Sequence, residues 1–499
     1  MKRIGLLTFA IVVTSGCFKN NTQNIGSTQV YVKSTYALPK TLDPAQMNDV
    51  PSLAFSEIAY EGLLRLGTSF DLLPALAKSW EIDATGTQIT FTLQEASKFH
   101  DGSPVTADDV VASLSRLTQS SSVVSKYYEI VAKNGIQAIS NGKVRIVLTK
   151  KFPPFLYIIA GATAKVFPKG KLTSAQFFKH PVGAGPFKIK SITKEKIEFE
   201  AFKDYYGEKP KISDLTLLQS SEEEATALAS KNLVHDMSLW PLSGKEKVFS
   251  MGQDFHFASA ETWIIGMNLR FKPFNSLAVR QKFKHDFDTD AFRSKFYPDS
   301  RPAHGYIPPA FPGHVSHPQK LASSIFIKPP KDKITIYFPK GLSQEIAMVN
   351  FIKNMMTEKG WNIEVLLTEW NYMMDLYNKK AMQAFVVSMN VDYPSPEFLL
   401  KNFQSQNTDN FSGINDKKLD ELLDQAEATD DRLKRTRIYE DAAKKVDELA
   451  LTVNLFHPTA HYWTHDCVEN FEPNLLSLVY IDYRKVSLQQ DCNVMQASL

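Results

Sequence analysis

Histidine side chains are the first residues of this sequence that could hold a metal ion. His457, His461 and His465 are spaced four residues apart, which on a helix would place three imidazoles on one face. A proline follows the first of them and favours extended chain instead. His314 and His317 form only a pair. Because spacing alone is weak evidence for a metal site, we expect no metal ion and no other cofactor here.

Motifs of the common catalytic classes do not occur in the sequence. It contains no phosphate-binding glycine loop, no His-Glu-x-x-His pair and no Gly-x-Ser-x-Gly elbow for a nucleophile. The three glutamates at 222–224 are typical of a helix start, where negative charge suits the helix dipole. We therefore expect a protein that is not an enzyme. A secreted hydrolase is the weaker alternative, since no nucleophile and base occur together.

One carboxylate, Asp392, stands where a binding protein would use it. It lies in residues 391–396 (VDYPSP), shortly after a predicted strand at 384–388. Ligands of parallel α/β sheets bind beyond the carboxyl ends of the strands. Pro394 and Pro396 keep the segment extended and delay the next helix, so that Asp392 can point into a cleft. The alternative is that Asp392 caps that helix or forms a turn.

The elements that must position Asp392 alternate between strands and helices over residues 333–455. Apolar periodicity and helix-end signals predict strands at 334–338, 363–367 and 384–388, and helices at 343–359, 370–378, 417–428 and 432–449. Such alternation predicts a parallel sheet with helices packed on its faces.

The preceding part of the chain has more antiparallel character. Thr106 and Asp109 form a capping box for a helix through Leu117. Residues 187–202 alternate polar and apolar side chains, as antiparallel strands do. Further helices are predicted at 51–65 and from 222, and further strands at 88–93, 143–148 and 214–218. The fold class is therefore α/β throughout.

The N-terminus predicts export and a lipid anchor. A basic start is followed by an apolar run at 4–13, which is shorter than the roughly 20 residues that span a bilayer but suits a signal peptide. Small residues directly before Cys17 resemble a lipoprotein signal-peptidase site. We predict a signal peptide at 1–16, a lipid on Cys17 and a flexible polar tether at 17–27. A plain signal peptide is the alternative.

Charge and cysteine usage fit an exported protein. The 499 residues carry 57 basic and 54 acidic side chains, a net charge of +3, which is no basis for nucleic acid binding. If Cys17 carries lipid, Cys467 and Cys492 remain as an even pair that can form a disulfide in an oxidising compartment. Two free thiols are the alternative.

Six segments carry a resemblance to a known family. They occur in the family's order and are residues 36–45 (YALPKTLDPA), 60–66 (YEGLLRL), 73–80 (LPALAKSW), 99–110 (FHDGSPVTADDV), 181–187 (PVGAGPF) and 267–280 (MNLRFKPFNSLAVR). The chain resembles the extracellular solute-binding proteins of family 5, the oligopeptide, dipeptide and nickel class that feeds ATP-driven importers. The resemblance covers nearly all of the mature chain.

That resemblance implies the two-lobe fold of type II periplasmic binding proteins, with an additional α/β subdomain and a hinge of two crossing strands. Lobe I would comprise residues 28–50, 183–265 and 466–499, the additional subdomain 51–182, and lobe II 266–465. The lobes would close on a ligand held between them.

Ligand-binding residues are also implied by the resemblance. Asp392 matches the aspartate that holds the α-ammonium group of a peptide, a charge-assisted contact, although Ser395 replaces the family's second aspartate. An added peptide strand would be held by backbone groups at Ser388, Met389, Asn390, Asn48 and Val50. Aromatic rings near the ligand would be Trp370, Trp263 and Trp240, for which core packing is the alternative.

The function that the resemblance implies is capture of peptides and their delivery to the permease and ATPase subunits of an ABC transporter. The protein would be a monomer on the cell envelope, facing the periplasm or the cell exterior and touching the membrane only through its lipid. A nickel chelate, haem or an oligosaccharide is the alternative cargo for the same scaffold. A surface adhesin or chaperone is a more distant alternative.

Overall fold

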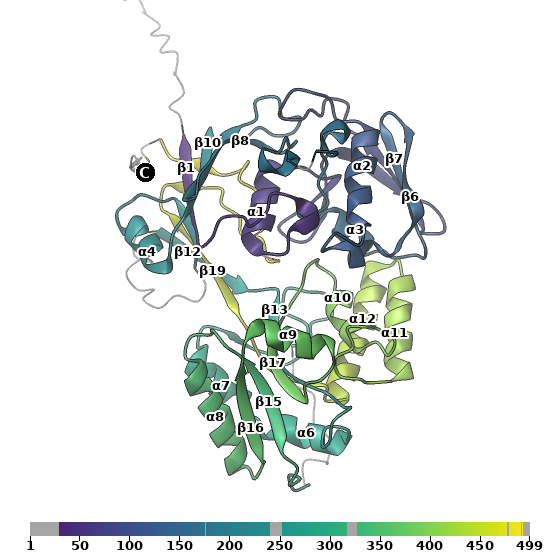
Figure 1. Ribbon diagram of the computed structural model, residues 1–499, viewed down its shortest axis with the longest axis vertical. Helices are drawn as coiled ribbons and strands as arrows, with labels where there is room; N and C mark the ends of the chain where they lie inside the picture. The colour runs from purple at the N-terminus through teal and green to yellow at the C-terminus, as the bar shows by residue number, and fades with distance from the viewer. Residues whose placement is uncertain are drawn as a thin grey trace, which may run out of the picture.

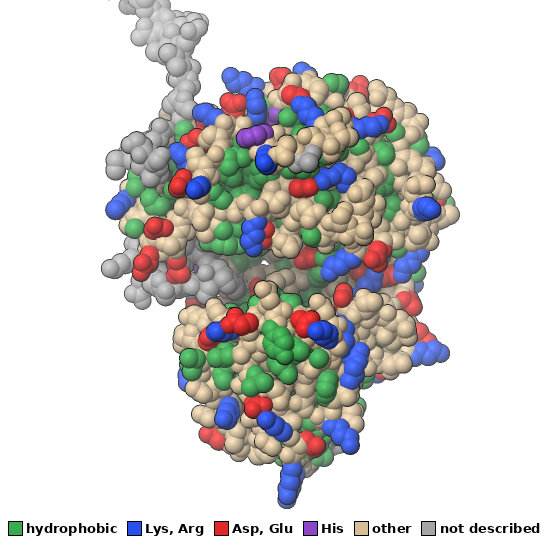
Figure 2. Space-filling model, viewed as in Figure 1, with side chains coloured by type: hydrophobic (Ala, Val, Ile, Leu, Met, Phe, Trp, Pro, Cys, Tyr) green, Lys and Arg blue, Asp and Glu red, His purple; other side chains and the backbone are tan. Residues whose placement is uncertain are grey.

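The computed structural model describes residues 29–174, 176–239, 252–316, 327–476, 479–490 and 492. These residues form an upper body, which holds lobe I and the additional subdomain, and a lower body, lobe II (Figure 1). A hollow separates the two bodies on the face shown in Figure 2. In the described ranges, none of the helices combines the length and the apolar composition needed to cross a membrane.

A seven-stranded mixed sheet forms the centre of lobe I. In spatial order it contains β12 (Gly252–Ala258), β19 (Thr459–His465), β11 (Asp236–Leu239), β1 (Val30–Thr35), β10 (Asp214–Gln219), β9 (Lys196–Ala201) and β8 (Phe187–Ile192). β8 and β9 pair antiparallel, as the alternation over 187–202 predicts, whereas β1 is parallel to both its neighbours. The sheet therefore joins segments that lie far apart in the sequence.

Two helices of the upper body differ in how well the sequence signals predict their limits. α4 (Glu222–Ser230) begins at the predicted glutamates, with Ser221 and Glu224 forming a capping box. α1 (Val50–Ala59) is shorter than the predicted helix at 51–65. Beyond it, β2 (Leu64–Leu66) pairs with β3 (Leu72–Pro74), so strand pairing overrides the local helical pattern.

The additional subdomain is built on a four-stranded antiparallel sheet in the order β4 (Ala77–Ile82), β5 (Gln88–Leu93), β7 (Lys143–Leu148) and β6 (Val131–Ser140). α2 (Ala107–Leu117) has the predicted capping box between Thr106 and Asp109 and packs on this sheet. α3 (Phe155–Ile159) follows β7. Short 3-10 helices are η1 (Pro44–Gln46), η2 (Ser125–Tyr128), η3 (Lys169–Lys171), η4 (Phe177–Lys179) and, in lobe II, η6 (Lys401–Phe403).

Lobe II contains a six-stranded sheet in the order β14 (Arg301–Pro302), β18 (Thr452–His457), β13 (Glu261–Met267), β17 (Ala384–Asn390), β15 (Ile334–Pro339) and β16 (Ile363–Thr368). β15 is parallel to β16 and β17, which confirms the parallel part predicted from the alternation of strands and helices. β13 and β18 pair antiparallel. β13 precedes the strands predicted at 334–388, and β18 follows the last predicted helix.

Helices cover both faces of the lobe II sheet. One apolar core includes side chains of α6 (Leu277–Asp286), α7 (Thr289–Phe296) and α8 (Glu345–Glu358). The core on the other face includes side chains of α9 (Trp370–Asn378), α10 (Glu397–Leu400), α11 (Lys417–Ala428) and α12 (Arg432–Glu448). Alternate residues of β13 and β17 therefore enter different cores.

The chain passes between the two large sheets twice. β12 ends at Ala258 in the lobe I sheet, and β13 begins at Glu261 in the lobe II sheet. β18 ends at His457 in lobe II, and β19 begins at Thr459 in lobe I, with Pro458 between them. These passages differ from the predicted lobe limits at 265/266 and 465/466, because strand pairing changes sheet several residues earlier.

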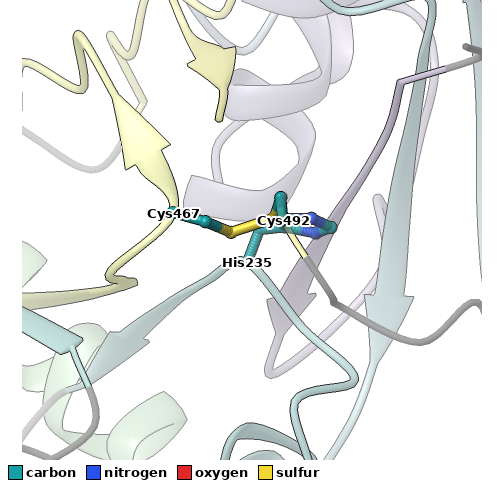
Figure 3. A group of neighbouring side chains, drawn as sticks. All are labelled: His235, Cys467 and Cys492. Carbon is teal, nitrogen blue, oxygen red and sulfur yellow. A yellow bond between two sulfur atoms is a disulfide. The ribbon is translucent and has the colours of Figure 1, made fainter. Parts of the chain in front are cut away.

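The C-terminal segment returns to lobe I. β20 (Val468–Glu469) pairs with β21 (Ser487–Leu488), and a disulfide joins Cys467 to Cys492 with their Cα atoms 5.3 Å apart. Figure 3 shows His235 beside this disulfide. Cys17, the predicted lipid site, lies outside the described residues, so the lipid remains a prediction.

Candidate ligand-binding site

A cavity of about 830 Å³ lies between the upper body and lobe II. Its lining comes from lobe I, from the additional subdomain and from lobe II, and four predicted residues are part of it: Asn48, Val50, Asn390 and Asp392. Most other lining side chains are apolar or aromatic. A cavity of this size with a few polar groups is typical of a small-molecule site.

The ends of β13 and β17 bring the polar residues to the cavity. Ala260 accepts a hydrogen bond from the Val391 backbone, and both side chains are buried in one lobe II core at the border of the cavity. Their neighbours Glu261, Asn390 and Asp392 also line the cavity. β17 continues two residues beyond the predicted end at 388, which carries Asn390 to the cavity edge.

Asp392 faces the cavity and has one hydrogen-bond donor from the other body. The Tyr127 hydroxyl of η2 donates to its carboxylate across the cleft. Burial by the surrounding protein raises the pKa of Asp392, while the hydrogen bond from Tyr127 and the charge of Lys126 oppose that rise. The helix α10 is preceded by Pro396, so Asp392 does not cap it. The carboxylate is therefore a group that gains from a cation in the cavity.

Four predicted binding residues do not line the cavity. The Trp263 ring stacks on Phe456. It follows Glu261 by two residues on the same face of β13, farther from the cavity. Met389 packs against the lobe II core on the other face. Ser388 lies behind two lining residues, since its hydroxyl is within hydrogen-bond distance of Glu261 and of Asn390 Oδ1.

Trp370 is the fourth of these residues. It is the first residue of α9 and is 49% exposed, away from the cavity lining. Trp240 lies outside the described residues.

Several lining residues were not predicted. Lys126 and Tyr127 come from the additional subdomain, Glu261 from the start of β13, and His461 from β19. Tyr480 comes from the C-terminal segment. None of these positions carries a local sequence signal of its own, because the cavity is formed by segments that meet only in the folded chain.

A second set of contacts joins the additional subdomain to lobe II outside the cavity. Lys150 Nζ lies 2.7 Å from Glu427 Oε2 of α11, and Lys401 Nζ lies 2.6 Å from Glu427 Oε1. Burial alone would raise the pKa of Glu427, but Lys401 and Lys150 outweigh it and hold that pKa below its usual value. Lys151 pairs with Asp430 beside them. We call the two that cross the cleft, Lys150–Glu427 and Lys151–Asp430, the interlobe pairs.

The histidines do not assemble as their spacing suggested. His457 is buried in β18, and burial lowers its pKa to about 3. His461 and His465 lie on β19, where His461 lines the cavity and His465 contacts Cys467. His317 lies outside the described residues. An extended strand separates these imidazoles, as the intervening proline favoured.

One histidine and two cysteines do lie together among the described residues. The ligand atoms of His235, Cys467 and Cys492 are within 4.8 Å of one another (Figure 3). The sulfurs are bonded to each other, and His235 Nδ1 accepts a hydrogen bond from the Val32 backbone. A disulfide offers no thiolate to a metal ion, so this group is explained by the disulfide.

Known proteins share both sequence and fold with this chain. It is 24% identical over 447 residues to the dipeptide-binding protein of Escherichia coli, covering 79% of this chain and 82% of that protein. The substrate-binding protein CtaP of a Listeria monocytogenes ABC transporter matches with a TM-score of 0.79 at 20% identity, over 92% of this chain and 99% of CtaP.

A peptide complex is among the similar structures. The oligopeptide-binding protein AppA of Bacillus subtilis, solved with a nonapeptide, matches with a TM-score of 0.74 at 18% identity, over 93% of this chain and 100% of AppA. These matches confirm the predicted two-lobe type II fold with an additional subdomain. The model of the bacterial extracellular solute-binding proteins, family 5, matches residues 71–411. The chain belongs to the bacterial extracellular solute-binding proteins of family 5.

Proposed function

We propose that this protein is the substrate-binding component of an ABC importer and that it carries peptides in the interlobe cavity to the permease and ATPase subunits. The observation that carries this proposal is the Asp392 carboxylate, which lines a cavity of about 830 Å³ between the two lobes. The relatives named for dipeptides and the AppA nonapeptide complex support the class of ligand.

Asp392 binds the free α-amine of the peptide. An ammonium group is the charge that unmodified peptides share, and a hydrogen bond between two charged groups is roughly twice as strong as a neutral one. The Tyr127 hydroxyl donates a hydrogen bond to Oδ2 of Asp392, and Oδ1 is the oxygen that accepts from the ammonium. This contact with the amine does not itself depend on the side chains of the peptide.

The peptide backbone pairs with the edge of β17. β13 pairs with β17 along its whole length, but β15 pairs with β17 only at Ala384 and Phe385. In the described sheet, the side of β17 that faces away from β13 therefore has no strand partner after Phe385. An extended peptide would add to such an edge as a strand. Asn390 and Asp392 stand at the cavity end of that edge.

Closure of the lobes follows from the two passages between the sheets. Residues 259–260 and Pro458 are short connections at which the lobes can rotate relative to each other. A peptide that touches both lobes binds the closed arrangement better and shifts the population towards it. The permease then receives the closed, loaded form, and no covalent bond is made or broken.

Anchoring by the lipid on Cys17 would hold the protein at the cell envelope through the tether at 17–27, as a monomer facing the periplasm or the cell exterior. We keep the predicted division into lobe I, the additional subdomain and lobe II, with the limits between the two lobes moved to residues 259–260 and 458. We place the hinge at the two passages described above.

Peptides blocked at the N-terminus should bind poorly. Native mass spectrometry of the purified protein should show a spread of bound peptide masses. Titration calorimetry with one tripeptide, as the free amine and as its N-acetyl form, should give at least a tenfold weaker affinity for the acetyl form. Equal affinities would contradict amine recognition by Asp392. Bound mass that contains a metal or a haem would instead support the alternative cargo.

Removing the interlobe pairs should open the unliganded protein. The double variant Lys150→Ala, Lys151→Ala deletes both cations, each in a partly exposed pair worth roughly 0.2–1 kcal/mol. We expect a two- to fivefold lower peptide affinity and a longer mean distance between spin labels on the two bodies. Lys78→Ala, which removes a pair within the subdomain, is the control. Unchanged distances would show that the pairs do not hold the lobes together.

A further inference from the structure

The charged residues that line the cavity are mostly acidic. Among the described lining residues, the carboxylates are Glu222, Glu261 and Asp392, and the one permanently cationic side chain is Lys126. The charge of Lys126 acts on Asp392. A single peptide amine at Asp392 therefore leaves Glu261 as a second carboxylate in the lining.

Glu261 is a second carboxylate that, like Asp392, lines the cavity. It stands directly opposite Asn390 in the pairing of β13 with β17. Among the hydrogen bonds of its carboxylate is one from the neutral hydroxyl of Ser388. Burial raises the pKa of Glu261 above its usual value. Desolvating an ionised carboxylate is unfavourable unless an opposite charge accompanies it.

The spacing of Glu261 from Asp392 suits one ligand. Asp392 follows Asn390, the last residue of β17, by two positions, which span at most about 7 Å. Directly opposed residues of antiparallel strands, such as Asn390 and Glu261, have Cα atoms about 5 Å apart. A lysine or arginine side chain near the amino end of an extended peptide covers that distance. The amine would lie at Asp392 and the basic side chain at Glu261.

We propose that Glu261 is a specificity site for a second cationic group, so that the cavity prefers peptides with lysine or arginine as the first or second residue. This inference rests on the proposed peptide-binding function and deepens it. Ser388 holds the carboxylate in place and acts as a positioning residue. A neutral side chain at the same place would leave Glu261 buried without an opposite charge.

The test compares matched tripeptides by titration calorimetry. Lys-Ala-Ala and Ala-Lys-Ala are compared with the same peptides in which norleucine replaces lysine, since norleucine keeps the aliphatic stem and lacks the charge. We expect the wild-type protein to bind the better lysine peptide at least tenfold more tightly than its norleucine partner. In Glu261→Gln this ratio should fall below twofold. Glu261→Asp, which keeps the charge on a shorter stem, should retain an intermediate ratio.

Controls separate this inference from the proposed function. Glu364→Gln removes a carboxylate of the same lobe that does not line the cavity, and it should keep the wild-type ratio. A ratio near one in the wild-type protein, or a full ratio in Glu261→Gln, would overturn the inference while peptide binding stands. If neither peptide of a pair binds, the proposed function fails and the inference fails with it.

Discussion

Asp236→Asn should lower the stability of lobe I by roughly 3–5 kcal/mol, the usual cost of breaking a buried ion pair by removing one charge. Asp236 is fully buried on β11 and lies 2.9 Å from Lys33 Nζ. Its other oxygen accepts hydrogen bonds from Tyr31 and Tyr483 at 2.9 and 3.0 Å. The asparagine variant leaves the Lys33 ammonium buried without a countercharge, and its amide NH2 must face either that ammonium or both tyrosine hydroxyls.

Urea unfolding followed by tryptophan fluorescence measures this loss, because Trp463 is buried on β19 beside Met237 of β11. The double variant Asp236→Asn, Lys33→Met removes both charges and should recover at least half of the lost stability, since a buried pair costs much of what it gains. Glu95→Gln breaks an exposed pair with Lys78 and should change stability by about 0.5 kcal/mol or less. An equal loss in Asp236→Asn and in the double variant would refute the ionic explanation.

Sequence patterns predict a helix or strand well when its apolar face can be recognised within a short window of residues. The helices at 370–378 and 417–428 have the predicted limits, because an apolar face occurs in each short window and Asp416 also caps the second helix. The helix at 51–65 was too long, since β2 pairs with β3 and this partner is not visible in a local window. Strand pairing likewise fixes the passages between the lobes.

The cavity shows the same limit at the level of side chains. Asp392 was predicted from its own loop, because prolines and a strand end are local signals. Glu261 and Tyr127 reach the cavity through contacts with residues more than a hundred positions away, such as Asn390 and Asp392. Trp263 has the residue type expected of a ligand contact, but packing on Phe456 places it in the core. Only the fold separates these outcomes.

Asp392→Asn should weaken the binding of peptides with a free amine by about 10- to 100-fold, which corresponds to about 1.5–3 kcal/mol for a hydrogen bond between charged groups. The amide keeps the shape of the side chain and an acceptor for Tyr127, but it has no charge for the ammonium. The affinity for the N-acetyl form of the same peptide should change much less. Asp375→Asn, which alters an exposed pair with Lys379 on α9, is the matched control.

The pH dependence of binding gives an independent measure of the same carboxylate. Burial raises the pKa of Asp392 in the empty cavity, and a bound ammonium lowers it, so binding releases a proton when the pH is near the raised value. Affinity for a free amine should therefore fall as the pH decreases through the pKa of the empty site and level off below the pKa of the loaded site. Asp392→Asn should remove this part of the pH dependence. A variant that keeps the wild-type pH profile, or that loses the acetyl peptide equally, would show that another group holds the amine.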